Sequence, residues 1–273
     1  MRLRIGQIDY ANCTPIFTAL KSNFDCTDYC FVSGVPSTLN AMLATGEIDL
    51  CPSSSIEYGK ASEKYCLLPD ISISSIGAVK SVFLFSRVPI EDLDNKTVGL
   101  TTESDTSVNL LKIILAKKHG HTNHFQRTSL PLAEALKSFS ALLLIGDAAL
   151  KTAMTHHGLY VYDLGELWHD FTGLPFVFAL WIVRRDAAAE KHAEIKALSG
   201  KLKAAKQLAY DSYESIASDC SEREWMGTEA LVDYWRTISY DLTPEHCAGL
   251  QRFFRYAAEL GILSREPEIL IFS

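Results

Sequence analysis

Strand-like and helix-like patterns alternate along the first two-thirds of the chain. Short runs of β-branched and aromatic residues predict strands at LRIGQI (3–8), IDLCPSS (48–54) and SVFLFS (81–86). Apolar residues at helical spacing predict a helix from about Pro15 and another at PSTLNAMLATGE (36–47). Such alternation is typical of parallel sheets with helices on both faces.

The alternation begins again after VPIEDLDNK (88–96), a connector rich in turn residues. PFVFALWIVRR (175–185) then has strand character, and we expect it to lead the chain back to the first unit. Between these segments the pattern predicts strands at TVGLT (97–101), FQRTS (125–129), ALLLI (141–145) and YVYDL (160–164), with helices over 106–119 and from Pro131.

From Asp186 onward the chain is rich in Ala, Lys and Glu at helical spacing, and the Thr-Pro-Glu sequence at 243–245 is typical of a helix start. We therefore predict an α/β protein of two lobes with a helical C-terminal segment. Residues 1–90 and 176–273 are expected to form the first lobe and residues 91–175 the second, with a ligand cleft between the lobes.

Composition narrows the class of protein. The chain has 273 residues, of which 48% are hydrophobic and 22% charged, as is usual for a soluble globular protein. Its 26 basic and 33 acidic residues give a net charge of −7, which argues against a nucleic-acid or anionic-membrane partner. No signal-peptide pattern or membrane span is recognisable, so we expect a cytoplasmic protein. The seven cysteines are scattered, and we predict reduced thiols and no metal site.

Four predicted strand–helix junctions are unusually polar. They carry Asn12 and Thr14; Ser53, Ser54 and Ser55; the TTESDTS segment with Thr106 and Ser107; and Gly146 with Asp147. In open α/β sheets, ligands bind beyond the carboxyl ends of strands, where helix N-termini offer free N–H groups and partial positive charge. The pattern is therefore consistent with an anion-binding site. Helix capping, worth about 1 kcal/mol per cap, is the alternative explanation for each junction.

Histidines contribute less to the predicted site. His119, His121 and His124 fall near a turn at Gly120, and His156 and His157 lie at a predicted helix end. We interpret all five as solvated or structural rather than catalytic.

The same junctions make the sequence recognisable. The segments IGQIDYANCTPIF, VKSVFLFS, LTTESDTSVNLLKIIL, LLIGDAAL and DLGELWHDFTGLPFVFALWIVRR follow one another between about Ile5 and Arg185. In this order they resemble the MqnA family, the chorismate dehydratases of the futalosine route to menaquinone. The resemblance implies a fold like that of the type II periplasmic binding proteins. It also implies that chorismate loses water to give 3-[(1-carboxyvinyl)oxy]benzoate without a cofactor, since elimination coupled to aromatisation needs no redox partner.

The resemblance also implies roles for individual residues. Two helix N-termini in facing lobes would hold the two carboxylates of chorismate, and the expected substrate-binding residues are Ser54, Ser55, Thr106, Ser107 and Gly146. Asn12 would position the leaving hydroxyl or a carboxylate at the reacting ring, and Ser81 would orient the substrate. Neither is a base at neutral pH. The proton is therefore expected to go to the enolpyruvyl carboxylate of the substrate or to Asp147.

Alternative functions stay open at this point. The related 1,4-dihydroxy-6-naphthoate synthase uses a His base, but Gly146 occupies the corresponding position here. A cyclohexadienyl or prephenate dehydratase would share the scaffold, although no motif favours one. A non-catalytic binding protein or sensor for a small carboxylate would share the fold, because fold alone does not fix function. Nothing in the sequence indicates an oligomeric state.

Overall fold

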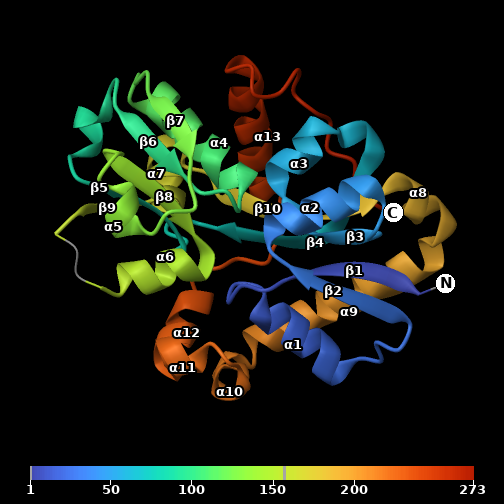
Figure 1. Cartoon of the computed structure of the whole chain (residues 1–273). Coiled ribbons are helices and arrows are strands. Elements are labelled where there is room, and N and C mark those ends of the chain that lie inside the picture. Colours follow the sequence, from blue (N-terminus) through green and yellow to red (C-terminus); the bar gives the residue numbers. More distant parts are fainter. Residues whose placement is uncertain (1, 156–157) are drawn as a thin grey trace.

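The computed structural model describes residues 2–155 and 158–273, so the expectation for His156 and His157 lies outside the described residues. The chain forms two lobes, each built on a five-stranded sheet (Figure 1). The first sheet has the order β2-β1-β3-β10-β4, and its strands are β1 (Leu3–Ile8), β2 (Tyr29–Gly34), β3 (Leu50–Ser54), β4 (Tyr65–Ser75) and β10 (Phe176–Arg184). The second has the order β7-β6-β8-β5-β9, with β5 (Val82–Ser86), β6 (Thr97–Leu100), β7 (His124–Arg127), β8 (Ala141–Ile145) and β9 (Tyr160–Asp163).

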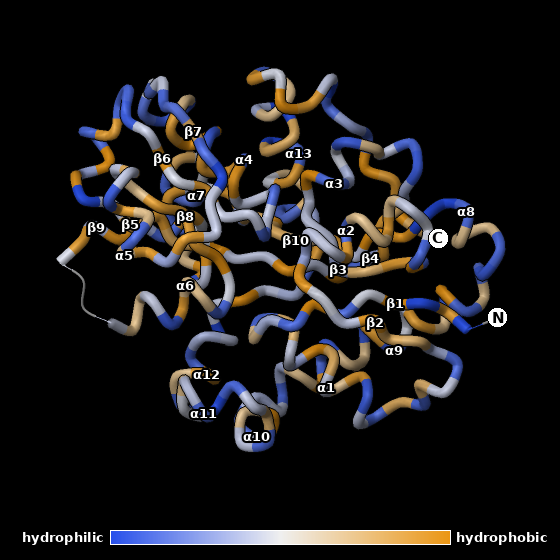
Figure 2. The backbone as a smooth tube through the Cα atoms, in the orientation of Figure 1, coloured by the Kyte–Doolittle hydropathy of each residue, from blue (hydrophilic) through white to orange (hydrophobic). Residues whose placement is uncertain are grey.

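Helices follow most strands of both sheets. Those of the first lobe are α1 (Thr14–Asn23), α2 (Pro36–Thr45), α3 (Ser55–Lys60), the short η1 (Ser62–Lys64), α8 (Arg185–Glu190) and α9 (His192–Tyr210). Those of the second are η2 (Ile90–Leu93), α4 (Asp105–Ile113), its π-helical continuation η3 (Ile114–Lys118), α5 (Leu132–Ala135), α6 (Gly146–Ala153) and α7 (Leu164–Thr172). Figure 2 shows hydrophobic residues concentrated along the strands of the two sheets.

Both sheets are mixed rather than parallel, which corrects the prediction. β10 runs antiparallel to β3 and β4, and β5 runs antiparallel to β8 and β9. These are the two strands by which the chain enters each sheet from the other lobe, so the strand–helix alternation does not set their direction. β5 pairs only with strands of the second sheet, whereas the expected boundary at residue 90 assigned it to the first lobe.

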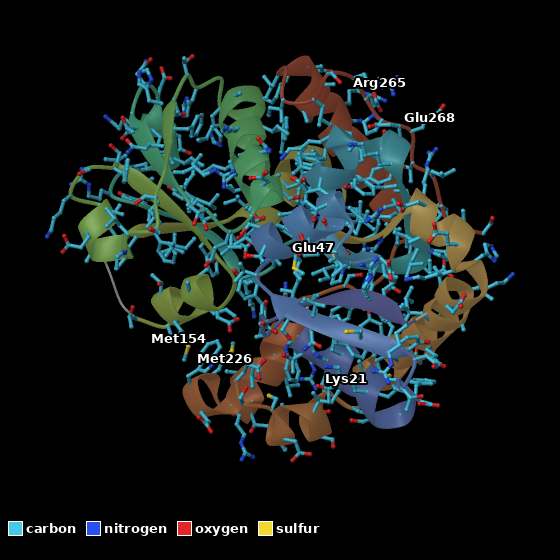
Figure 3. All side chains as sticks on the ribbon, turned by 45° about the vertical axis from the view of Figure 1, so that its right-hand side comes forward. Lys21, Glu47, Met154, Met226, Arg265 and Glu268 are labelled. Atoms are coloured by element: carbon cyan, nitrogen blue, oxygen red, sulfur yellow. The ribbon has the colours of Figure 1, made fainter. Side chains whose placement is uncertain are left out.

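The C-terminal helices contact both lobes. They are α10 (Tyr213–Asp219), α11 (Arg223–Met226), α12 (Thr228–Trp235) and α13 (Pro244–Glu259). Lys151 in α6 lies 4.5 Å from the ring centre of Trp225 in α11, and Figure 3 shows Met154 and Met226 on this same side of the molecule. On the opposite side (Figure 1), α13 contacts both lobes: its Glu259 pairs with Lys117 at 2.6 Å, and the helix also packs on α3. No helix of the described ranges is long and apolar enough to cross a membrane.

Candidate functional site

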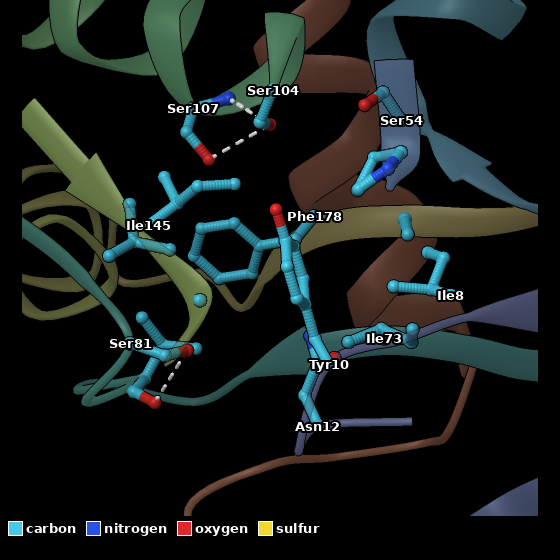
Figure 4. Close-up of a pocket in the computed structure, with 15 residues that line it drawn as sticks. Ile8, Tyr10, Asn12, Ser54, Ile73, Ser81, Ser104, Ser107, Ile145 and Phe178 are labelled. Atoms are coloured by element: carbon cyan, nitrogen blue, oxygen red, sulfur yellow. Dashed lines mark hydrogen bonds between the residues drawn. The ribbon is translucent and has the colours of Figure 1, made fainter. Parts of the chain in front are cut away.

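A pocket lies between the two lobes, at the carboxyl ends of several strands. Its empty space, with the open mouth included, is about 540 Å³. Both lobes contribute to the lining, which consists of Ile8, Tyr10, Asn12, Pro36, Ser54, Ile73, Val79, Ser81, Val82, Ser104, Ser107, Ile145, Gly146, Phe178 and Ala179 (Figure 4).

The lining combines apolar walls with hydroxyl, amide and backbone groups. None of the lining residues within the described ranges is a Lys, Arg, Asp, Glu or His. In Figure 4, Ser104, Ser107 and Ser54 lie at one end, Asn12 and Ser81 at the other, and the Tyr10 ring stands between them. An anion bound here would depend on neutral donors and helix N-termini.

The polar side chains at the start of α4 have different roles. The Ser104 hydroxyl caps the helix by accepting the backbone N–H of Ser107 at 3.3 Å, and both hydroxyls line the pocket. Thr106 does not line it: its Oγ1 is fully buried and accepts the backbone N–H of Ile56 at 3.1 Å, which joins α4 to α3 across the lobes. Asp105 pairs with Lys60 at 2.6 Å. Capping and lobe contacts therefore account for part of this cluster, and Ser104 and Ser107 remain at the pocket.

The other serines predicted as substrate ligands separate in the same way. Ser54 lines the pocket at the end of β3. Ser55 is buried and donates its hydroxyl to the carbonyl of Val177 at 2.7 Å, so it ties α3 to β10 and does not reach the pocket.

Gly146 and Ser81 meet where β8 leads into α6. The Gly146 N–H donates to the carbonyl of Ser81 at 2.8 Å, and both residues line the pocket. Gly146 has φ +57°, and a Cβ there would lie 3.0 Å from the Tyr10 ring. The Ser81 hydroxyl lies 3.5 Å from the carbonyl of Val79. It also bonds the phenol of Tyr234, whose pKa is raised by burial and partly lowered by that bond.

Helices of both lobes begin at the pocket. α4 and α6, which contribute Ser107 and Gly146, both follow strands of the second sheet. The first lobe contributes Ser54, the N-cap residue of α3, and Pro36, the first residue of α2, which has no N–H to donate. It also contributes Asn12, which lies two positions before α1.

Asn12 carries an unpaired acceptor at the pocket. Its Oδ1 is buried and has no hydrogen-bond partner within the described part of the chain. Since buried polar atoms are nearly always paired, this oxygen is suited to a donor on a ligand.

Asp147 lies beside the pocket rather than in its lining. Its Oδ1 accepts the backbone N–H of Ala11 at 3.1 Å. Burial raises the pKa of this carboxyl group, the bond from Ala11 lowers it, and the nearby Glu222 raises it further.

The sequence prediction missed Tyr10, Ser104 and Phe178. The Tyr10 hydroxyl donates to Glu103 Oε2 at 2.8 Å, and burial followed by this bond raises the pKa of the phenol. Tyr10 lies two positions before Asn12, and Phe178 lies in the segment GLPFVFA, but neither aromatic residue differs in pattern from a core residue. Ser104 could have been found as the cap residue three positions before Ser107.

Comparison with known families now identifies the chain. Residues 3–259 match the model of a family described as menaquinone biosynthesis. The chain belongs to this family. The resemblance to MqnA seen in the sequence is thereby confirmed.

Two curated relatives carry the same name. A chorismate dehydratase of Thermus thermophilus is 33% identical over 94% of this chain and 95% of its own length. A chorismate dehydratase of Campylobacter jejuni is 33% identical over 64% of each chain.

Solved structures support the fold. A crystal structure from Archaeoglobus fulgidus matches with a TM-score of 0.77 and 19% identity, covering 96% of this chain and 98% of that one. The periplasmic aliphatic sulphonate binding protein SsuA of Escherichia coli matches with a TM-score of 0.70 and 17% identity over 98% and 90% of the two chains. The predicted two-lobed, periplasmic-binding-protein-like fold is confirmed.

Proposed function

We infer that this protein is a chorismate dehydratase of menaquinone biosynthesis, a hydro-lyase that eliminates water from chorismate. The inference rests on the position of five residues in one pocket, together with the relationship of the chain to a known enzyme. Asn12, Ser54, Ser81, Ser107 and Gly146, which lie in separate segments, line one pocket in a chain related along nearly its whole length to a chorismate dehydratase.

The reaction removes the hydrogen at C3 of the ring and the hydroxyl at C4. As the C3–H bond breaks, its electrons delocalise through the ring double bond into the ring carboxylate, and loss of hydroxide from C4 then completes the aromatic ring. Donors that strengthen as this charge develops stabilise the transition state. We assign the ring carboxylate to the hydroxyls of Ser104 and Ser107 at the N-terminus of α4, because that helix end favours negative charge.

Asn12 and Ser81 are proposed to act at the reacting side of the ring. Doubly ionised chorismate has one hydroxyl donor, at C4, and the unpaired Oδ1 of Asn12 is an acceptor. This match supports Asn12 as the residue that positions the leaving hydroxyl. Ser81, fixed through its carbonyl to Gly146, would orient the substrate from the second lobe.

The proton acceptor is proposed to be the enolpyruvyl carboxylate of the substrate. No side chain of the described pocket lining is a base at neutral pH. The carboxylic acid formed in this step can return its proton to the departing hydroxide, so that water leaves and the carboxylate is restored. Asp147 is the second route, although its side chain does not line the pocket.

The dihydroxynaphthoate synthase alternative lacks support in the pocket. A His base would have to reach the ligand, and no lining residue in the described ranges is a His. We further propose that the enzyme works in the cytoplasm and in the futalosine route, on the strength of the family resemblance.

Incubation of the purified, metal-free protein with chorismate tests the proposal. Mass spectrometry and ultraviolet absorbance should detect an aromatic product lighter than chorismate by one water. Chorismate that is left unchanged but raises the melting temperature would indicate a binding protein instead. If chorismate is neither converted nor raises the melting temperature, it is not the ligand.

Site variants then test the assigned roles. Asn12→Ala and Ser81→Ala should each lower kcat about 100-fold, as loss of one preorganised polar contact to a transition state does. Ser138→Ala, at an exposed serine of the second lobe, is the control and should keep the full rate. Wild-type rates in both site variants would remove these residues from the mechanism.

A further inference from the structure

Two hydrogen bonds cross the cleft at the residues immediately before Asn12. The Tyr10 hydroxyl donates to Glu103 Oε2 at 2.8 Å, and the Ala11 backbone N–H donates to Asp147 Oδ1 at 3.1 Å. Glu103 precedes α4 and Asp147 is the second residue of α6, so both acids belong to the second lobe. The second lobe thus binds two consecutive residues of the first-lobe segment that carries Asn12.

Two carbonyl groups of this segment are bound by the C-terminal part of the chain. The Ala11 carbonyl accepts the indole N–H of Trp235 at 2.7 Å, and the Asn12 carbonyl accepts the hydroxyl of Tyr240 at 2.7 Å. Trp235 and Tyr240 are fully buried in the C-terminal segment, which makes them rigid supports. The contacts from Glu103 and Asp147 are therefore the ones that make the position of Asn12 depend on the placement of the second lobe.

We propose that Asp147 and Glu103 are positioning residues that align Asn12 with the substrate by holding Tyr10 and Ala11 across the closed cleft. The proposal rests on the proposed function, because Asn12 is assigned to the leaving hydroxyl there. Separation of the lobes at this point would break both bonds and leave the segment to its contacts with Trp235 and Tyr240. Closure over the substrate and alignment of Asn12 are then one event.

This role for Asp147 requires an acceptor oxygen and no proton transfer. The side chain lies outside the pocket lining, and its Oδ1 is bound to the Ala11 N–H. An amide oxygen can accept the same hydrogen bond. Burial already disfavours the charged form and raises the pKa of the carboxyl group, so a neutral amide fits this environment.

Paired substitutions separate positioning from acid–base chemistry. Asp147→Asn and Glu103→Gln keep the acceptor and should retain chorismate turnover within about threefold, whereas Asp147→Ala and Glu103→Ala lose a hydrogen bond and should lower kcat/KM about 3- to 10-fold. Asp94→Ala is the control, because Asp94 accepts the Thr122 N–H at 2.8 Å within the second lobe and should leave turnover unchanged. Asp147→Asn should also keep the wild-type pH profile of chorismate turnover.

A second measurement does not depend on turnover. The indole N–H of Trp235 reports on the Ala11 carbonyl, so its NMR signal should shift in Asp147→Ala and much less in Asp147→Asn. If wild-type protein does not convert chorismate, the proposed function fails while this signal still tests the contact.

Three results would overturn the proposal. Asp147→Asn as inactive as Asp147→Ala, with the melting temperature kept, would assign Asp147 to proton transfer. Full turnover in both alanine variants would show that the contacts are dispensable. An unmoved Trp235 signal in Asp147→Ala would show that Ala11 is held without Asp147. Should Asp147→Ala fail to fold, the partly exposed Glu103 pair decides the question by the same criteria.

Discussion

Replacement of Gly146 by alanine should disturb both the fold and the pocket. The residue has φ +57°, a backbone conformation that disfavours any Cβ, and the added methyl group would lie 3.0 Å from Tyr10 Cε2. The ring cannot simply withdraw, because its hydroxyl is bound to Glu103 at 2.8 Å. The backbone conformation and the contact with the Tyr10 ring therefore both destabilise the variant.

The magnitude follows from these two contributions. An L-residue in the left-handed region costs about 1–2 kcal/mol. Displacing the ring by a few tenths of an ångström weakens one hydrogen bond, which adds about 1 kcal/mol. Gly120→Ala is the matched control, because Gly120 has φ +71° and nothing within 4 Å of its Cβ position. We expect Gly146→Ala to lose about 1 kcal/mol more unfolding free energy than the control.

Thermal unfolding and chorismate turnover check this prediction together. A difference of about 1 kcal/mol corresponds to about 2–4 °C in Tm for a protein of this size. Gly146→Ala should in addition lower kcat/KM, because the methyl group and the displaced ring enter the pocket, whereas Gly120→Ala should not. Equal Tm values for the two variants with unchanged turnover would refute the steric argument at Tyr10.

Two further substitutions and one deletion test the scaffold. Asp49→Asn should cost about 3 kcal/mol, because it leaves the buried Lys191, paired at 2.6 Å, without its partner. Burial disfavours the charged form of Asp49, but its hydrogen bonds outweigh this and lower its pKa, so its contribution holds at neutral pH. The Tm difference should therefore shrink as the pH falls below about 4. Ser104→Ala should lower Tm by about 2–4 °C through the lost cap and raise KM in the turnover assay. Deletion of 267–273 removes the two backbone bonds to Leu67 and exposes the β4 edge, which should cause self-association detectable by light scattering.

Local patterns in the sequence were sufficient to predict many of the individual elements. The apolar runs at 3–8 and 141–145 coincide with β1 and β8, because a buried strand bounded by turn residues leaves its pattern within a few positions. The N-terminus of α13 falls at the predicted Thr243, whose hydroxyl accepts the N–H of His246 in a capping box. The polar strand–helix junctions likewise predicted Asn12 and Ser107 as site residues, and both line the pocket.

Long-range packing determined which partners these residues have. β4 was missed because Pro69 and Asp70, the latter at φ +61°, interrupt its pattern, and it is a strand through its pairing with β10. The same kind of packing turned Thr106 toward Ile56, a residue 50 positions away. Periodicity reports on which face of an element is buried and on nothing beyond that element.

The contacts across the cleft show most clearly what a local sequence pattern cannot predict. Glu103 is separated by 93 positions from Tyr10, and Asp147 by 136 from Ala11. Both pairs nevertheless form hydrogen bonds at the two residues before Asn12. Each of these residues has a local pattern that fits a loop, a cap or a core position equally well. Only the packing of two lobes against each other brings their donors and acceptors within bonding distance, because that distance depends on the whole fold and not on any one segment.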